Sequence, residues 1–170
     1  DAGSRAIKIV VIDAGDVHVV GSCVADQGVQ QDQLARRLYD GLLADHGISP
    51  DRIARRIATG YGRNIISFAD KTITEITCHA VGVHHVCPQA RTVIDIGGQD
   101  SKTIRLGSDG TVEDFAMNDR CAAGCGRFLE VLADRLGYRL DQLGEISATS
   151  TAPATISSMC VVFAETEIIG

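Results

Sequence analysis

The sequence predicts an α/β protein built from two similar lobes, the second of them truncated in this chain. Stretches rich in β-branched residues alternate with stretches whose leucines recur at helical spacing, as expected for alternating strands and helices. A short motif, DxGxxxxK, occurs at residues 1–8 and again at residues 95–102. With 170 residues, of which 45% are hydrophobic, the chain is long enough for one packed core or for two small ones.

In the first half of the chain, apolar residues follow the strand and helix periods in turn. A β-branched stretch, a tight turn and a second such stretch predict a hairpin over residues 5–24. Leucines spaced four apart predict an amphipathic helix over residues 32–47. Residues 51–63 predict a strand that runs into a Gly-bearing turn, and residues 66–86 predict mostly helix, ended by Pro88.

The second half of the chain repeats this alternation. Residues 91–98 predict a buried strand that opens into a Gly turn, and residues 101–117 predict a hairpin around the sequence GSDG. Residues 122–137 predict a helix, residues 139–150 a short helix and loop, and residues 156–170 a last helix. Because the chain begins inside a motif and stops after a helical pattern, we expect it to be part of a longer protein.

The repeated motif indicates where the two lobes lie in the sequence. DAGSRAIK at residues 1–8 and DIGGQDSK at residues 95–102 share Asp, Gly and Lys, and each leads into a strand, a turn and a second strand. We therefore expect a first lobe over residues 1–92 and a second, incomplete lobe over residues 93–170. Each lobe would begin with a hairpin whose Gly turn faces the other lobe.

A pair of such Gly turns is suited to binding phosphate groups. Glycine lets backbone N–H groups approach an anion, and Asp supplies hard oxygen donors for Mg²⁺. Two facing turns could clamp a nucleotide and position a water for attack on its terminal phosphate. Either turn alone is explained as well by ordinary hairpin chemistry, but the pair favours the clamp. Asp95 and Gln99 are the catalytic candidates. The candidates for binding phosphates, Mg²⁺ and water are Asp1, Gly3, Ser4, Lys8, Asp95, Gly97, Gly98, Gln99 and Asp100.

The charge and hydropathy of the chain argue against two classes of partner. The net charge is −6, so the basic face that non-specific nucleic-acid binding needs is missing. No apolar stretch approaches the roughly 20 residues that span a bilayer, and none has the pattern of an export signal. We expect no nucleic-acid partner, no membrane partner and a cytoplasmic location.

Two of the cysteines have positions that suggest more than packing. Cys121 is placed at the expected N-cap of the helix over residues 122–137, where the helix dipole favours a thiolate, and Cys160 lies near the start of the last helix. Two thiolates are too few for a four-cysteine site, but a two-fold dimer would supply four to one iron–sulfur cluster. The chain has six cysteines, which we expect to be reduced thiols: Cys23, Cys78, Cys87, Cys121, Cys125 and Cys160.

Three other interpretations of these cysteines stay open on the residues alone. A redox pair of Cys121 and Cys125 is geometrically poor, because residues four apart on a regular helix do not form a good disulfide. A zinc site would need further Cys or His ligands at close spacing, which the sequence lacks. Simple burial of the thiols is at least as well supported as a cluster.

The two DxGxxxxK segments resemble the phosphate motifs of the superfamily of acetate kinase, sugar kinases, heat-shock proteins and actin. The Walker-type GxxxxGK(S/T) motif is absent. The resemblance implies two ribonuclease H-like lobes, the actin-like ATPase fold, with ATP and Mg²⁺ bound between them. The adenosine-binding Gly motif of the superfamily is missing from this chain, which agrees with a truncated second lobe.

Longer segments resemble a narrower family. VIDIGGQDSK, MNDRCAAGCGRFLEVLA, ATGYGR, TEITCHA and SSMCVVFAETEII are together similar to the activator ATPases of 2-hydroxyacyl-CoA dehydratases, in the BadF/BadG/BcrA/BcrD ATPase family. The resemblance implies a homodimer with one bridging 4Fe-4S cluster, held by Cys121 and Cys160 of each subunit. ATP hydrolysis would drive one low-potential electron into a 2-hydroxyacyl-CoA dehydratase or related double-cluster enzyme. Ferredoxin or flavodoxin would be the electron source. Cys125 departs from the family pattern, which usually has Thr at this position.

Alternative functions remain within and outside this family. The ATPase subunits of benzoyl-CoA reductase share the wider family and would use the same residues. A small-molecule kinase or a nucleotide sensor of the same fold would bind ATP without a cluster, so iron content separates these possibilities.

Several other residues have both a functional and a structural interpretation. Glu75 and His79 lie on one helix face and could approach the nucleotide, but a structural hydrogen bond between them is the simpler explanation. Thr59 and Gly60 predict a turn that could contact phosphate. His84 and the histidine that follows it are better explained as surface residues at a helix end than as metal ligands.

Overall fold

The computed structural model describes residues 1–118, 126–157 and 161–169, and these residues form two compact units. The first unit contains Asp1–Ala90 together with the turn Leu106–Val112, and the second contains Arg91–Arg105 and the described residues from Glu113 onward. Both units combine strands and helices, so the α/β class predicted from the sequence is observed. Among the described residues, no helix has both the length and the apolar character needed to cross a membrane.

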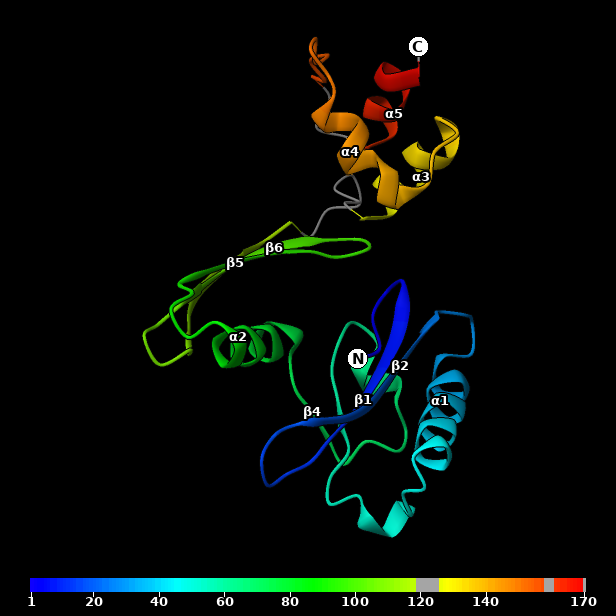
Figure 1. Cartoon of the computed structure of the whole chain (residues 1–170), viewed down its shortest axis with the longest axis vertical. Helices are drawn as coiled ribbons and strands as arrows, with labels where there is room; N and C mark the ends of the chain where they lie inside the picture. The colour runs from blue at the N-terminus through cyan, green and yellow to red at the C-terminus, as the bar shows by residue number, and fades with distance from the viewer. Residues whose placement is uncertain (119–125, 158–160, 170) are drawn as a thin grey trace. The chain divides into compact units, whose positions relative to one another are not determined.

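The first unit begins with an antiparallel hairpin covered by a helix. Strand β1 (Ala6–Ile12) pairs with β2 (Val19–Asp26), and helix α1 (Gln31–Asp45) packs against both strands (Figure 1). Alternation along the strands and the helical spacing of leucines both direct apolar side chains to this interface. The buried apolar residues of the hairpin and helix are Ile7, Ala35, Tyr39, Leu42 and Leu43.

The segment after α1 differs from the sequence prediction. The 3₁₀ turns η1 (Pro50–Arg52) and η2 (Arg63–Ile65) flank a two-residue strand β3 (Ile57–Ala58), which pairs in parallel with β4 (Lys71–Thr72). The strand predicted over residues 51–63 is therefore reduced to two residues. Short turns, and hydrogen bonds from side chains to residues distant in sequence, hold this segment in place of a longer run of strand-to-strand hydrogen bonds.

The helix predicted over residues 66–86 forms only in its second part, as α2 (Glu75–Val86). Ahead of it, Asp70 accepts hydrogen bonds from the backbone N–H of Arg56 at 2.7 Å and from the guanidinium at 3.0 Å. The Arg56 side chain also holds the pKa of Asp70 below its ordinary value. Ahead of the helix the chain forms a turn at residues 67–68 and then strand β4, and the helix begins after Thr74, whose hydroxyl accepts from the N–H of Thr77.

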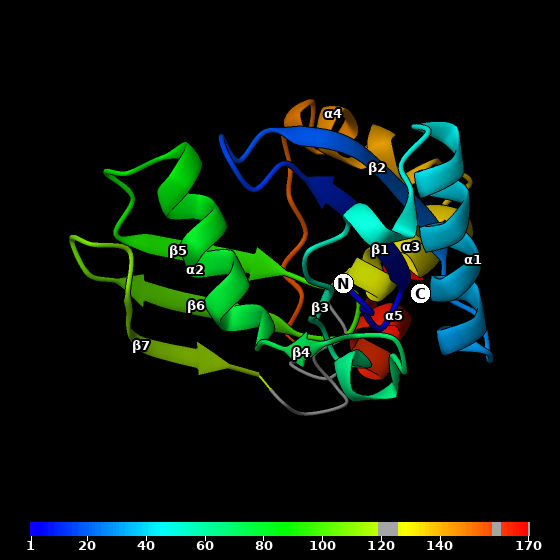
Figure 2. The ribbon, with the colours of Figure 1, turned by 90° about the horizontal axis from the view of Figure 1, so that it is seen from below.

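The second unit contains a three-stranded sheet followed by helices. Strand β6 (Ser101–Leu106) lies between β5 (Thr92–Ile96) and β7 (Val112–Met117), as Figure 2 shows. The strand predicted over residues 91–98 forms as β5, but the prediction that it is buried is wrong, because Ile94 and Ile96 are 72% and 62% exposed. Only the face of the sheet that carries Ile104 of β6 is buried.

The helices of the second unit are short. They are α3 (Gly126–Arg135), the 3₁₀ turn η4 (Leu140–Gln142), α4 (Leu143–Ala148) and α5 (Val161–Ile169). Helices α3 and α5 contact each other, and an ion pair between Arg135 and Glu165 of 3.5 Å joins them. Residues 119–125 and 158–160, which include Cys121, Cys125 and Cys160, lie outside the described residues.

Candidate functional site

The first DxGxxxxK motif folds into a turn closed by its own ends. The Lys8 ammonium donates a hydrogen bond to Asp1 Oδ2 at 3.0 Å, and the backbone N–H of Lys8 donates to the Asp1 carbonyl at 3.0 Å. Within the turn, the N–H of Gly3 donates to the carbonyl of Ala6 at 3.1 Å. The seven-residue spacing of Asp and Lys in the motif therefore places the two residues opposite each other where the two arms of the turn meet.

The second motif repeats these bonds at the corresponding positions. Lys102 donates to Asp95 Oδ2 at 3.4 Å, and these two residues are opposite each other in the β5–β6 register. The N–H of Gly97 donates to the carbonyl of Asp100 at 2.8 Å, as Gly3 does to Ala6 in the first turn. The sequence repeat thus corresponds to one local structure that occurs in both units.

The two turns differ in charge and burial. The Lys102 side chain is 3% exposed and the Lys8 side chain is 52% exposed. Lys102 also pairs with Asp100 at 2.7 Å, a carboxylate that is replaced by Ala6 in the first turn. A buried ammonium between two carboxylates fixes both of them in place, whereas the Asp1–Lys8 pair is open to solvent and screened.

A second loop packs against the first turn. The N–H of Ala2 donates to the carbonyl of Thr59 at 2.8 Å, and the N–H of Gly62 donates to the carbonyl of Ala2 at 2.8 Å. Gly60 has φ +88°, and a Cβ at this position would lie 2.2 Å from Asp1 Oδ1. Only glycine lets the loop approach the Asp1 carboxylate this closely. Sequence reasoning predicted a turn at Thr59 and Gly60, and the structure places it against Asp1.

Helix α3 makes the equivalent approach to the second turn. The N–H groups of Gly126 and Arg127 donate to the carbonyls of Gly97 and Gly98 at 2.9 and 3.0 Å. A Cβ on Gly126 would lie 2.8 Å from the Gly97 carbonyl oxygen, so this position also requires glycine. The sequence analysis missed this contact, because nothing in the local pattern links Gly126 to a turn almost thirty residues earlier.

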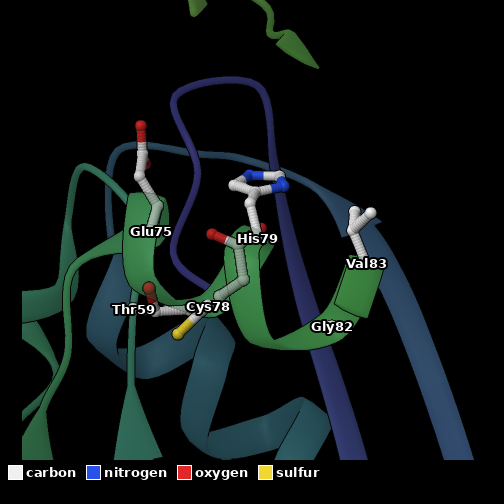
Figure 3. Close-up of a pocket in the computed structure, with 7 residues that line it drawn as sticks. Thr59, Glu75, Cys78, His79, Gly82 and Val83 are labelled. Atoms are coloured by element: carbon white, nitrogen blue, oxygen red, sulfur yellow. The ribbon is translucent and has the colours of Figure 1, made fainter. Parts of the chain in front are cut away.

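An open cavity of about 340 Å³ adjoins Asp1 in the first unit. Most of its lining residues come from α2 and recur at helical spacing. Glu75, His79 and Val83 project to the same side of this helix (Figure 3). The lining residues are Asp1, Thr59, Glu75, Cys78, His79, Gly82 and Val83. The cavity brings Glu75 and His79 to the same site as Asp1, which the sequence analysis left open.

The polar groups of this cavity fit a hydrated Mg²⁺. Carboxylate and hydroxyl oxygens are the donors that Mg²⁺ or its bound waters prefer, and Asp1, Glu75 and Thr59 supply them. The Thr59 hydroxyl is buried and has no hydrogen-bond partner among the described residues. Such an atom is expected to bond to a ligand or an ordered water.

The comparison with protein families identifies the chain. The sequence model of the BadF/BadG/BcrA/BcrD ATPase family matches residues 1–170. The chain belongs to this family.

Individual members of the family agree with this assignment. The activator of lactoyl-CoA dehydratase from Anaerotignum propionicum is 46% identical over 99% of this chain and 64% of that protein. A benzoyl-CoA reductase subunit from Thauera aromatica is 35% identical over 99% of this chain and 61% of that protein. The chain therefore spans somewhat less than two thirds of the length of these relatives.

A solved family structure confirms the predicted fold class. Component A of the (R)-2-hydroxyglutaryl-CoA dehydratase of Acidaminococcus fermentans superposes with a TM-score of 0.89 at 41% identity, over 99% of this chain and 64% of that one. The actin-like ATPase fold that the family resemblance implies is therefore the fold of this family member.

The remaining predicted residues have varied surroundings. Ser4 and Gly98 are half-buried and Gln99 is exposed. Cys23, Cys78 and Cys87 are free thiols, and burial raises the pKa of the Cys23 thiol. The cluster ligands implied by the family resemblance, Cys121 and Cys160, lie outside the described residues, as does Cys125.

One group of possible metal ligands was not anticipated. Asp13, Asp16 and His18 lie at the exposed tip of the β1–β2 hairpin, with ligand atoms within 4.8 Å of one another. His18 Nδ1 already bonds to Asp16, which lowers the pKa of that carboxyl. The Asp16–His18 bond, together with the bond that Asp13 Oδ1 accepts from the N–H of Gly15, accounts for the arrangement without a metal.

Proposed function

We propose that the protein containing this chain is an ATP-dependent one-electron donor that activates a 2-hydroxyacyl-CoA dehydratase. Membership of an ATPase family supports nucleotide hydrolysis. The 46% identity to the activator of lactoyl-CoA dehydratase supports the activating role. The identity to the benzoyl-CoA reductase subunit is lower, at 35%, so a dehydratase activator is favoured over a reductase subunit.

The observation that carries this proposal is the bond between α3 and the second turn. The N–H groups of Gly126 and Arg127, which follow Cys121 by five and six residues in the sequence, donate to the carbonyls of Gly97 and Gly98 in the candidate phosphate turn. A change in that turn when phosphate binds or leaves would be transmitted to α3 through backbone hydrogen bonds.

The proposed nucleotide site uses the residues of both turns. The carboxylates of Asp1 and Asp95 would hold the waters around Mg²⁺, and Lys8 would offset the charge of the phosphates. Gln99, an exposed residue of the second turn, would orient the attacking water. Buried Lys102 would hold the carboxylates of Asp95 and Asp100 in place, rather than contact the nucleotide. Gly3, Ser4, Gly97 and Gly98 would form the rest of the phosphate contacts.

The proposed redox group is one 4Fe-4S cluster that bridges a homodimer. Cys121 and Cys160 of each subunit would hold it, and it would supply a low-potential electron that ferredoxin or flavodoxin replaces. Cys125, where relatives are expected to have Thr, would be a spare thiol. The double-cluster partner enzyme would receive the electron.

Iron and acid-labile sulfide analysis of the full-length protein, purified without oxygen, tests this proposal. We expect about two irons and two sulfides per subunit, as one four-iron cluster in a dimer requires. Cys121→Ser and Cys160→Ser should lose both. Cys125→Thr should keep them, and Cys87→Ser serves as a control at a half-buried thiol of the described chain.

The same preparations decide between the alternatives. ATP hydrolysis that rises on addition of a 2-hydroxyacyl-CoA dehydratase, together with the iron content above, supports an activator. Iron-free wild-type protein that still hydrolyses ATP contradicts the electron-transfer proposal. In that case a kinase or nucleotide sensor of the same fold becomes the better explanation.

A further inference from the structure

The Thr59 hydroxyl lines the cavity beside Asp1, and it has no hydrogen-bond partner among the described residues. The backbone carbonyl of Thr59 accepts from Ala2 at 2.8 Å, which ties Thr59 to the residue next to Asp1. The next residue, Gly60, is in contact with the Asp1 carboxylate. The Thr59 Oγ1 atom is nevertheless buried without a partner among the described residues. A buried hydroxyl is costly unless something in the cavity completes its hydrogen bond.

The opposite wall of the cavity is one face of α2. Glu75, His79 and Gly82 line it at spacings of three and four residues, and Cys78 lies on the same wall. The helix is held at its start by the Thr74 cap, so these side chains are presented by a rigid element. Gly82 adds no side chain, and a Cβ built there would meet no atom within 4 Å.

The charges around the cavity select the chemical class of its occupant. Asp1 and Glu75 are two acidic residues of its lining, and Lys8 pairs with the carboxylate of Asp1. A phosphate without its metal would be placed against like charge. A hydrated divalent cation would not, because its waters donate hydrogen bonds to carboxylate, hydroxyl and imidazole acceptors. Mg²⁺ keeps several of its waters when it binds nucleotide phosphates, and the open cavity of about 340 Å³ has room for them.

We propose that this cavity receives the hydration shell of the Mg²⁺ that accompanies the nucleotide, with Thr59 and His79 as positioning residues for its waters. This inference rests on the proposed nucleotide-dependent function. It adds water-mediated contacts from the 59–62 loop and the second turn of α2 to the site formed by the two DxGxxxxK turns. Thr59 and His79 act through water, so they should affect the metal-bound nucleotide and leave the metal-free nucleotide unaffected.

Calorimetric titration of the full-length protein with ADP, in Mg²⁺ and separately in EDTA, tests this inference. Thr59→Val keeps the β-branched shape and removes the hydroxyl, and His79→Gln removes the imidazole. Each should weaken binding of Mg²⁺-ADP about three- to tenfold, the loss expected for one hydrogen bond. Binding of ADP in EDTA should not change. Thr151→Val, at an exposed residue remote in sequence, is the matched control.

Filling the cavity provides a second test that does not depend on removing a polar group. Gly82→Gln and Gly41→Gln both replace a helical glycine that has open space around its Cβ. Both should raise the urea midpoint, because glutamine is a better helix former than glycine. Only Gly82→Gln should weaken Mg²⁺-ADP binding, so a loss of affinity cannot be ascribed to unfolding.

Cys78 offers a readout on the unmodified protein. Without nucleotide and without oxygen, N-ethylmaleimide should alkylate it slowly, as expected for a half-buried thiol. Mg²⁺-ADP should protect it, and ADP in EDTA should protect it less, when the labelled peptide is quantified by mass spectrometry.

The outcomes separate this inference from the proposed function. Wild-type affinity for Mg²⁺-ADP in Thr59→Val, His79→Gln and Gly82→Gln, with unprotected Cys78, overturns the cavity assignment and leaves the activator proposal intact. Equal weakening with and without metal also overturns it, because the residues would then act on the nucleotide or the fold. Wild-type protein that binds no nucleotide at all overturns the proposed function itself.

Discussion

Removing the same lysine from each of the two related turns should have very different energetic costs. Lys102→Met replaces a side chain that is 3% exposed and leaves Asp95 and Asp100 without the ammonium between them. Breaking a buried ion pair costs about 3–5 kcal/mol. Because the two carboxylate side chains are 20% and 32% exposed, we expect the lower end, about 3 kcal/mol. Lys8→Met removes a 52% exposed partner, and such pairs contribute about 0–1 kcal/mol.

Urea unfolding of the full-length variants at pH 7 measures this difference. With a slope of about 2 kcal/mol per molar urea, Lys102→Met should lower the midpoint by about 1.5 M and Lys8→Met by less than about 0.5 M. Adding Asp95→Asn and Asp100→Asn to Lys102→Met should recover part of the loss, since it removes the uncompensated charges. Equal urea midpoints for the two single variants would refute the reasoning that the burial of the lysine, and not its position in the motif, sets the loss of stability.

The other predictions concern the loop beside the first turn. Gly60→Ala should lower the free energy of unfolding by more than the roughly 1–2 kcal/mol of a left-handed backbone, because its Cβ would collide with the Asp1 carboxylate. Gly47→Ala, at φ +62° with open space around the Cβ, should lose only the backbone contribution. Urea midpoints measure both losses. If both cost the same, the contact with Asp1 is not tight. Asp70 is held below its ordinary pKa by Arg56, so its stabilising contribution is present above the unfolded-state pKa of about 3.9 and is lost as pH falls through the folded-state value. Asp70→Asn should therefore flatten the fall in urea midpoint between about pH 5 and pH 2, and an unchanged pH profile would contradict this assignment.

The sequence was most informative where interactions are local. The hairpin over residues 5–24 and the helix over residues 32–47 follow from periodicity, since both periods are set by backbone geometry. The DxGxxxxK motif likewise joins residues only seven apart, and its Asp–Lys contact recurs in both units. Over residues 66–73 periodicity was misleading, because Ser67 donates to Asp32 and Arg56 donates to Asp70, and the segment forms a turn and strand β4 instead of a helix.

The candidate site could be predicted only in part, for the same reason. Its motif residues were found from spacing, and the family resemblance, now supported by the match over residues 1–170, pointed to Cys121 and Cys160. The roles of these residues stay predictions. Thr59, His79 and Gly126 were not assignable from spacing, because each meets its turn through contacts across tens of residues of sequence.

The sequence by itself determined the repeat, the α/β class and the family, since each depends on residue identity and short spacing. Only the tertiary structure decided which of two identical motifs is buried, which loop closes on Asp1 and which helix is tied to Gly97. Burial and long-range backbone hydrogen bonds depend on how distant segments pack, and packing is a property of the whole chain. Two lysines at the same motif position therefore share one local geometry but contribute different amounts to the free energy of unfolding.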